Sequence, residues 1–313
     1  MPARLQGIIP PLVTPLKARG ELDRPGLKRL VERAIDGGVQ GVFILGTTGE
    51  APALNYRLRY ELVESTCELV AGRVPVLVGV TDTSLTESIE LAHYAKGSGA
   101  TAVMAAPPYY FPCGQEQLVR YYQQLAEDSP LPVFVYNMPN CTGINIAFET
   151  FESCTRHANI IGLKDSSGDL PAYKRLLDLR AARPDWSFFV GPESLLAESV
   201  RAGGDGGVNG GSQVYPELFV SLFAAAKAND DAECARLQAI VAKLRRIYAV
   251  GGDVLPVTRG IKCALSLLGV CQQNVCEPFT PYNSQQREEV RGVLQDLGLW
   301  QSEPAPAVAL TGV

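Results

Sequence analysis

The chain has 313 residues, of which 46% are hydrophobic and 19% charged, a composition typical of a globular protein with a large core. Its formal net charge of −5 argues against nucleic acid or an anionic membrane as a partner. The sequence has no apolar stretch long enough to span a bilayer, and its N-terminal residues lack the apolar core of a signal peptide. We therefore expect a cytoplasmic protein.

Cysteine and histidine spacing argues against the common metal and triad chemistries. The sequence holds eight cysteines but no Cys-x-x-Cys pair, and four of them, Cys67, Cys154, Cys234 and Cys263, fall within helical patterns. The only two histidines, His93 and His157, lie in helical patterns far from acidic clusters. We therefore expect neither a metal site nor a Ser-His-Asp triad, and no cofactor.

Short apolar runs alternate with amphipathic segments along most of the chain. Each run is a near-continuous apolar series, as expected for a parallel strand that is buried on both faces. The segments between them, such as 27–35, carry apolar residues at three- and four-residue spacing and often close on glycine. Strands are thus predicted at 7–14, 41–46, 74–80, 101–106, 132–137, 160–164, 186–190 and 206–210.

Eight successive strand–helix units predict an α/β fold, a closed (β/α)8 TIM barrel over residues 1–228. A doubly wound open sheet is the alternative, but no Gly-x-Gly-x-x-Gly turn follows the first strand. Residues 229–300 are predicted to form a C-terminal helical extension, and residues 301–313 a disordered tail. The helices of the extension are expected near 231–249, 255–268 and 284–298.

Reactive side chains stand where the predicted strands end. Lys164 closes one buried run, where burial is expected to lower its pKa and allow a Schiff base with a carbonyl substrate. The alternative without a catalytic role is a lysine whose side chain extends into solvent. Because strand C-termini share one face of a barrel, Lys164 should meet groups from three other strands. These are Thr47 and Thr48 in the turn Gly46-Thr47-Thr48-Gly49, the pair Tyr109-Tyr110, and Tyr136.

Imine chemistry gives each of these groups a role. A 2-keto acid brings a ketone for the lysine and a carboxylate for the hydroxyls and N–H groups of Thr47 and Thr48. A phenol such as Tyr136 can carry protons, and the protonated imine acts as the electron sink. Taken singly, the threonine turn could be only a tight turn, and the tyrosines could be rim or strand-end aromatics. Their joint position on one barrel face favours the functional interpretation.

Three segments resemble the signatures of the dihydrodipicolinate synthase and N-acetylneuraminate lyase family, and the resemblance spans residues 5–300. They are Gly46-Thr47-Thr48-Gly49-Glu50, Tyr136-Asn137-Met138-Pro139-x-x-Thr142-Gly143 and Gly162-Leu163-Lys164-Asp165-Ser166-Ser167-Gly168-Asp169. The resemblance implies a class I aldolase or lyase that acts on pyruvate or a 2-keto-3-deoxy acid.

The resemblance also implies site roles. Lys164 matches the Schiff-base residue and Tyr136 the proton carrier and carboxylate partner. Thr47 matches the hydroxyl that relays protons, and Thr48 the one that grips the carboxylate. Tyr110 matches a tyrosine lent across a dimer interface, which implies a homo-oligomer, a dimer or tetramer.

Two positions depart from the pattern. Cys141 stands where the synthases carry an arginine that binds the carboxylate of the aldehyde partner, and a thiol offers no bidentate cation. The sialic acid lyases carry an acidic pair after the seventh strand, and Glu193 keeps one of the two carboxylates, which could contact a substrate hydroxyl. The departure at Cys141 weighs against 4-hydroxy-tetrahydrodipicolinate synthase activity, which stays an alternative.

The glycine-rich segment 203–211 leaves two interpretations open. It could bind phosphate, as such loops do in other barrels, which would suit a phosphosugar isomerase. The simpler interpretation is close backbone approach to a small substrate, with the Val208 carbonyl and Asn209 near the imine. Two further hypotheses are a keto-deoxy sugar acid dehydratase that uses the same imine, and a non-catalytic barrel that senses or scaffolds.

Overall fold

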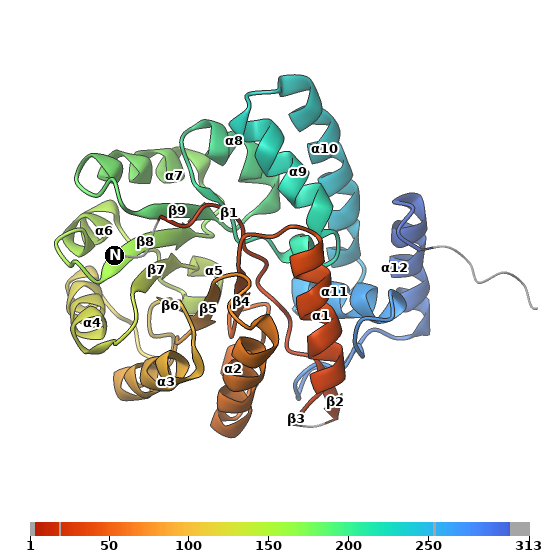
Figure 1. The fold of residues 1–313 in the computed structure, drawn as a ribbon, viewed down its shortest axis with the longest axis horizontal. Helices are drawn as coiled ribbons and strands as arrows, with labels where there is room; N and C mark the ends of the chain where they lie inside the picture. Colours follow the sequence, from red (N-terminus) through yellow and green to blue (C-terminus); the bar gives the residue numbers. More distant parts are fainter. Residues whose placement is uncertain (1–3, 19, 253–254, 301–313) are drawn as a thin grey trace, which may run out of the picture.

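The computed structural model describes residues 4–18, 20–252 and 255–300. Within these residues, eight parallel strands form one sheet in the order β1-β10-β9-β8-β7-β6-β5-β4. A bridge between Pro11 and Phe43 joins the two ends of this order, and the Leu12 N–H donates to the Phe43 carbonyl at 2.8 Å. The sheet is therefore closed, which confirms the predicted (β/α)8 barrel (Figure 1).

The strands of the barrel lie close to their predicted positions, although the first and last are shorter. The predicted strand 7–14 is reduced because Pro10 and Pro11 have no N–H to donate to a ladder. The observed strands are β1 (Gly7–Ile8), β4 (Val42–Ile44), β5 (Val76–Gly79), β6 (Ala102–Ala105), β7 (Val133–Asn137), β8 (Ile160–Asp165), β9 (Ser187–Val190) and β10 (Gly206–Gly207).

Helices follow the strands and cover the outside of the barrel. Several begin with side-chain caps, such as Asn55, whose amide oxygen accepts from the Leu58 N–H at 2.9 Å. The helices of the barrel are α1 (Arg24–Asp36), α2 (Tyr56–Val70), α3 (Leu85–Ser98), α4 (Gln115–Asp128), α6 (Phe148–Cys154), α7 (Leu170–Leu176), α8 (Leu196–Arg201) and α9 (Pro216–Lys227).

Two small elements lie outside the predicted alternation. An antiparallel pair, β2 (Leu16–Ala18) with β3 (Glu21–Leu22), precedes α1. A one-turn helix, α5 (Pro139–Thr142), follows β7 and carries Cys141. Both are too short for a periodic pattern to reveal them.

The C-terminal helices pack beside the barrel at the predicted positions. They are α10 (Asp231–Leu244), α11 (Pro256–Leu267) and α12 (Ser284–Asp296), and Figure 1 shows them gathered on one side of the molecule, next to α9. The predicted tail 301–313 lies outside the described residues. In the part of the chain that the structure describes, none of the helices has the length and hydropathy needed to cross a membrane.

The apolar core has two parts. Side chains between the strands and the outer helices form the larger part. A second cluster fills the barrel interior, and it includes Phe43, Tyr136 and Val208. This interior cluster places Tyr136 on the inner face of the barrel, where a small cavity opens.

The glycines of β10 are explained by barrel closure. A Cβ on Gly206, which has φ +145°, would lie 1.9 Å from the Gly7 carbonyl oxygen, so only glycine lets β10 pair with β1. A Cβ on Gly207 would lie 1.9 Å from the Asn209 side-chain oxygen. The glycine-rich segment therefore serves strand packing, and the expected close approach to a substrate is not needed to account for it.

Candidate active site

Lys164 lies on β8 with its side chain in the barrel interior, and only 3% of the residue is exposed. Its Nζ lies 4.1 Å from the centroid of the Tyr136 ring and 5.2 Å from that of the Phe43 ring. Among the described residues, it has no carboxylate within the 4 Å of an ion pair. The amine is thus held against two aromatic faces, and the alternative of a lysine that leans into solvent does not hold.

Tyr136 lies beside Lys164 because β7 and β8 pair with these two residues in register. Its hydroxyl is 3.4 Å from the Thr47 Oγ1 in the turn that follows β4. A Cβ on Gly46 would lie 2.4 Å from the Phe43 ring, so glycine is required where this turn passes over the ring. The structure therefore brings Lys164, Tyr136 and Thr47 together, as expected from their positions at strand ends.

A cavity of about 270 Å³ opens above these groups. Phe43, Gly46, Thr47 and Tyr136 line its inner part, and Cys141 lines its wall from α5. Cys141 is exposed as a whole residue, yet burial against the cavity raises the pKa of its thiol, while the Thr47 hydroxyl and the Lys164 charge act in the opposite direction. Four of the residues predicted for the site thus share the cavity: Gly46, Thr47, Tyr136 and Cys141.

Six predicted residues are not in the lining of this cavity. One is Lys164, whose amine lies against the Tyr136 and Phe43 rings that do line it. Thr48 is partly buried in the turn, and Val208 lies deeper in the interior cluster. Tyr110 is 77% exposed and lies on the outer rim beside Phe111. Asn209 is fully buried, and its amide donates to the Gly191 carbonyl at 2.8 Å.

Glu193 is the last of these six residues, and the expectation that it contacts a substrate hydroxyl has no support in this geometry. Its Oε1 accepts from the Gly211 N–H at 2.6 Å and from the Tyr248 hydroxyl at 2.8 Å. Burial raises its pKa, although these two hydrogen bonds act against the rise. Glu193 therefore ties the loop after β9 to the C-terminal helices.

A second polar layer lies on the outer side of the same strand ends. Asn137 and Asp165 are paired in the β7–β8 register one residue beyond Tyr136 and Lys164. The Asn137 amide donates to the Asp165 Oδ1 at 2.8 Å, and the Ser167 hydroxyl donates to the Oδ2 at 2.7 Å. Because side chains alternate along a strand, this outward pair fixes the register that sets Tyr136 against Lys164 on the inside.

The Asp165 carboxyl makes stability depend on pH, and replacement by asparagine tests this. Burial raises the pKa of Asp165, while hydrogen bonds from Ser167 and Asn137 oppose the rise. The stability that its neutral form contributes is complete below the ordinary aspartate value of 3.8 and is lost as pH rises through the raised value. We therefore expect the wild type to lose stability relative to Asp165→Asn as pH rises over that range. The difference between their free energies of unfolding, wild type minus variant, should fall.

Urea unfolding at a series of pH values measures this difference. Asparagine can still accept from Asn137 and donate to Ser167, so the variant should fold. Asp165→Ala is the matched control, because it leaves the Asn137 amide short of an acceptor and should lose about 1–3 kcal/mol at every pH. A pH-independent difference for Asp165→Asn would contradict the assignment.

Glu50, a member of the predicted turn motif, lines the cavity and is 4% exposed. Its Oε2 forms an ion pair with the Nζ of Lys262 on α11, which is fully buried. Its Oε1 accepts from the Cys276 N–H at 2.7 Å, and Lys262 also donates to the Asn274 carbonyl at 2.7 Å. The C-terminal helices thus hold the turn that carries Thr47.

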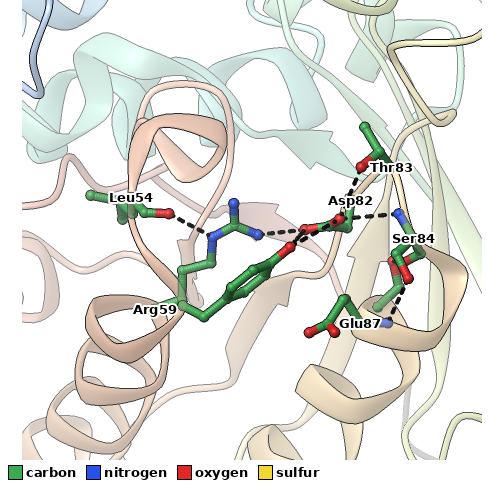
Figure 2. Close-up of polar contacts among 8 residues, drawn as sticks. Leu54, Arg59, Asp82, Thr83, Ser84 and Glu87 are labelled. Atoms are coloured by element: carbon green, nitrogen blue, oxygen red, sulfur yellow. Dashed lines mark hydrogen bonds and ion pairs between the residues drawn. The ribbon is translucent and has the colours of Figure 1, made fainter.

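A second buried ion pair joins α2 to the loop after β5 (Figure 2). Arg59 donates to the Asp82 Oδ2 at 2.8 Å and to the Leu54 carbonyl at 3.1 Å. Burial alone would raise the pKa of Asp82, but the Ser84 N–H and the Arg59 guanidinium outweigh it and lower the pKa. Burial and the nearby Asp82 raise the pKa of Tyr109, which lines the cavity, and Arg59 opposes this rise.

Sequence reasoning missed both ion pairs. Glu50 and Lys262 are separated by most of the chain, and no local pattern links them. Arg59 and Lys262 each occupy a position that the amphipathic pattern of their helix predicts to be buried. A charged residue at such a position is usually paired, and this was the available signal.

A closed barrel that brings a buried lysine, without an ion-pair partner among the described residues, together with a tyrosine and a threonine at its C-terminal face has the architecture of a class I, imine-forming lyase. Comparison with known proteins gives the same class. The chain belongs to the Dihydrodipicolinate synthetase family, which it matches over residues 4–297.

Solved structures and a curated relative resemble nearly the whole chain. A dihydrodipicolinate synthase from Bacteroides thetaiotaomicron is 46% identical, with a TM-score of 0.92 over 95% of this chain and 100% of that one. A prophage protein of the family from Escherichia coli K12, solved in complex with pyruvate, is 30% identical, with a TM-score of 0.89 over 94% and 99%. A probable 2-dehydro-3-deoxy-D-pentonate aldolase from Escherichia coli K12 is 32% identical over 95% and 98%. The protein is therefore an enzyme, a lyase of this family.

Proposed function

We propose that the protein joins pyruvate, or a related 2-keto acid, to an aldehyde through an imine on Lys164, or cleaves the same bond in reverse. The observation that carries the proposal is the Lys164 amine, buried against Tyr136 and Phe43 with no carboxylate within ion-pair distance among the described residues. Such an amine is free to attack a ketone, and the dry surroundings protect the imine from stray water. The pyruvate complex of the prophage relative supports the choice of keto acid.

The chemistry follows from these groups. The amine adds to the ketone, and the carbinolamine loses water to leave a protonated imine. The neighbouring carbon then loses a proton, and the resulting enamine attacks the aldehyde carbonyl to form the carbon–carbon bond. Water finally hydrolyses the imine, which releases a 4-hydroxy-2-keto acid and the free amine.

We assign the proton transfers to Tyr136, with Thr47 as its relay. Support for this role comes from the 3.4 Å between their oxygens and from the position of the Tyr136 ring beside Nζ. We assign the grip on the keto-acid carboxylate to the turn Gly46–Glu50, with the hydroxyls of Thr47 and Thr48 as donors.

We further propose that the enzyme is at least a dimer, in which Tyr110 reaches the site of the partner. Tyr110 and Phe111 are each 77% exposed and lie edge to face, 5.2 Å apart between ring centroids. An exposed aromatic pair at the rim of a cavity suits contact with a second copy. A dimer or a tetramer would satisfy this contact.

The experiment that tests the function traps the imine. Borohydride added with pyruvate should leave a covalent adduct on the peptide that contains Lys164. In Tyr136→Phe the adduct should form about 10²- to 10⁴-fold more slowly, because the phenol no longer carries protons to and from the carbinolamine. Timed quenching followed by digestion and mass spectrometry measures both results.

Tyr94→Phe is the matched control, because it removes a partly exposed phenol from α3, outside the cavity. It should form the adduct at the wild-type rate. An adduct on another lysine, or equal rates in the two phenylalanine variants, would show that Lys164 and Tyr136 do not have these roles.

A further inference from the structure

The cavity beside Tyr136, into which a second substrate would bind, has a mostly apolar lining. Its outer wall combines side chains from the barrel loops with side chains from the C-terminal extension. Met138 and Pro52 come from loops after β7 and β4, whereas Leu255 precedes α11 and Phe279 precedes α12. An apolar wall of this kind favours an apolar substituent, because water leaves both surfaces when they meet.

The polar groups of the lining are neutral or already paired. Thr81, Tyr109, Cys141 and Thr142 carry uncharged hydroxyl or thiol groups. Glu50 is the only charged residue among the described residues of the lining, and Lys262 neutralises it. A carboxylate that entered the cavity would therefore find hydroxyl donors but no cation among the described residues of the lining.

Three described cations interact with residues of the lining: Lys164 with Tyr136, Lys262 with Glu50 and Arg59 with Tyr109. Each is engaged by another group. Lys164 is consumed by the imine in the proposed reaction. Lys262 is fully buried against Glu50 and the Asn274 carbonyl. Arg59 is buried against Asp82 and the Leu54 carbonyl, as Figure 2 shows. Release of either cation would leave its carboxylate partner buried and unpaired, which is unfavourable. The binding free energy of a substrate carboxylate would have to offset this loss.

From this lining we infer that the second substrate is an uncharged aldehyde with an apolar substituent, and that carboxylated aldehydes are rejected. The inference rests on the proposed function and names the substrate class of the same site. The volume of about 270 Å³ lies just below the range typical of small-molecule sites, which suits a short or single-ring aldehyde. Met138, Leu255 and Phe279 are then specificity residues, two of them from the C-terminal extension.

A matched pair of aldehydes tests the inference. Benzaldehyde and 4-carboxybenzaldehyde differ by one carboxylate, and glyceraldehyde adds a hydroxylated comparison. With pyruvate as co-substrate, kcat/KM for benzaldehyde should exceed that for each of the other two, by about 100-fold for the carboxylated aldehyde. The rate of formation of the 4-hydroxy-2-keto acid measures all three.

A substitution in the wall should reverse the preference. Cys141→Arg places a guanidinium in the lining, and kcat/KM for 4-carboxybenzaldehyde should rise about tenfold or more. Cys141→Ser is the matched control, because it changes the polar atom without adding charge and should give no such rise. A rise in both variants would mean that hydrogen bonding, not charge, sets the specificity, and would overturn the inference.

Borohydride trapping with pyruvate alone separates this inference from the proposed function. If the adduct forms on Lys164 but 4-carboxybenzaldehyde or glyceraldehyde is used as well as benzaldehyde, the specificity inference is overturned and the imine chemistry stands. If pyruvate leaves no adduct, the proposed function fails and the inference fails with it. An adduct together with a preference for benzaldehyde supports both.

Discussion

Replacement of Lys164 by methionine is expected to reduce turnover by at least about 10⁴-fold while leaving the fold intact. Methionine has no amine to attack a ketone, so neither the imine nor the enamine can form. The fold should tolerate the change because Nζ faces the rings of Tyr136 and Phe43 and has no ion-pair partner among the described residues. A thioether also packs well against aromatic rings, so the free energy of unfolding should change by less than about 1.5 kcal/mol.

Activity and stability must be measured on the same preparation. Product formation from pyruvate and an aldehyde gives the first, and urea unfolding gives the second. Lys164→Arg is the control for charge, because it keeps a cation but offers no amine able to form an imine. If either variant retains turnover within tenfold of the wild type, Lys164 is not the covalent residue.

The barrel could be predicted from the sequence because its strands are buried on both faces. Segments such as 132–137 and 160–164 are apolar without alternation, and the amphipathic segments between them leave few other arrangements. The short strands at the seam between β1 and β10 were harder to place, because Pro10 and Gly206 shape the backbone there through contacts distant in sequence.

The core of the site followed from one geometric rule, that strand C-termini meet at one face. The rule brought Lys164, Tyr136 and Thr47 together correctly, because each stands at or just after the last inward residue of its strand. The same rule does not hold for Asn209, which follows the inward-facing Val208. Its side chain points outward, and its amide donates to the Gly191 carbonyl in the loop after β9. Strand alternation could have revealed this difference.

Partners supplied by distant segments could not be predicted. Glu193 follows a strand end, as a substrate-binding carboxylate would. Its Oε1, however, accepts a hydrogen bond from the hydroxyl of Tyr248 in the C-terminal helices. Glu50 likewise belongs to a local turn motif, and nothing in that motif shows that α11 supplies a lysine to it. In both cases the missing information was the packing of the extension against the barrel.

Replacement of Lys262 by methionine should lower stability, which the same change at Lys164 should leave nearly unchanged. The Glu50 carboxylate would stay buried without its cation, which we expect to lower the free energy of unfolding by about 3–5 kcal/mol. The Asn274 carbonyl would also lose a donor. Urea unfolding measures the loss, and Lys243→Met, an exposed change on α10, should shift the result by less than about 0.5 kcal/mol.

The double variant Glu50→Gln with Lys262→Met decides whether the buried charge causes the loss. Glutamine can still accept from the Cys276 N–H, and no net charge remains in the pair, so most of the lost stability should return. A double variant as unstable as Lys262→Met would assign the loss to packing around Lys262 and not to the charge. Because Glu50 shares its turn with Thr47 and lines the cavity, a loosened pair should also displace the relay hydroxyl, and turnover of Lys262→Met should fall even under conditions where the variant is fully folded.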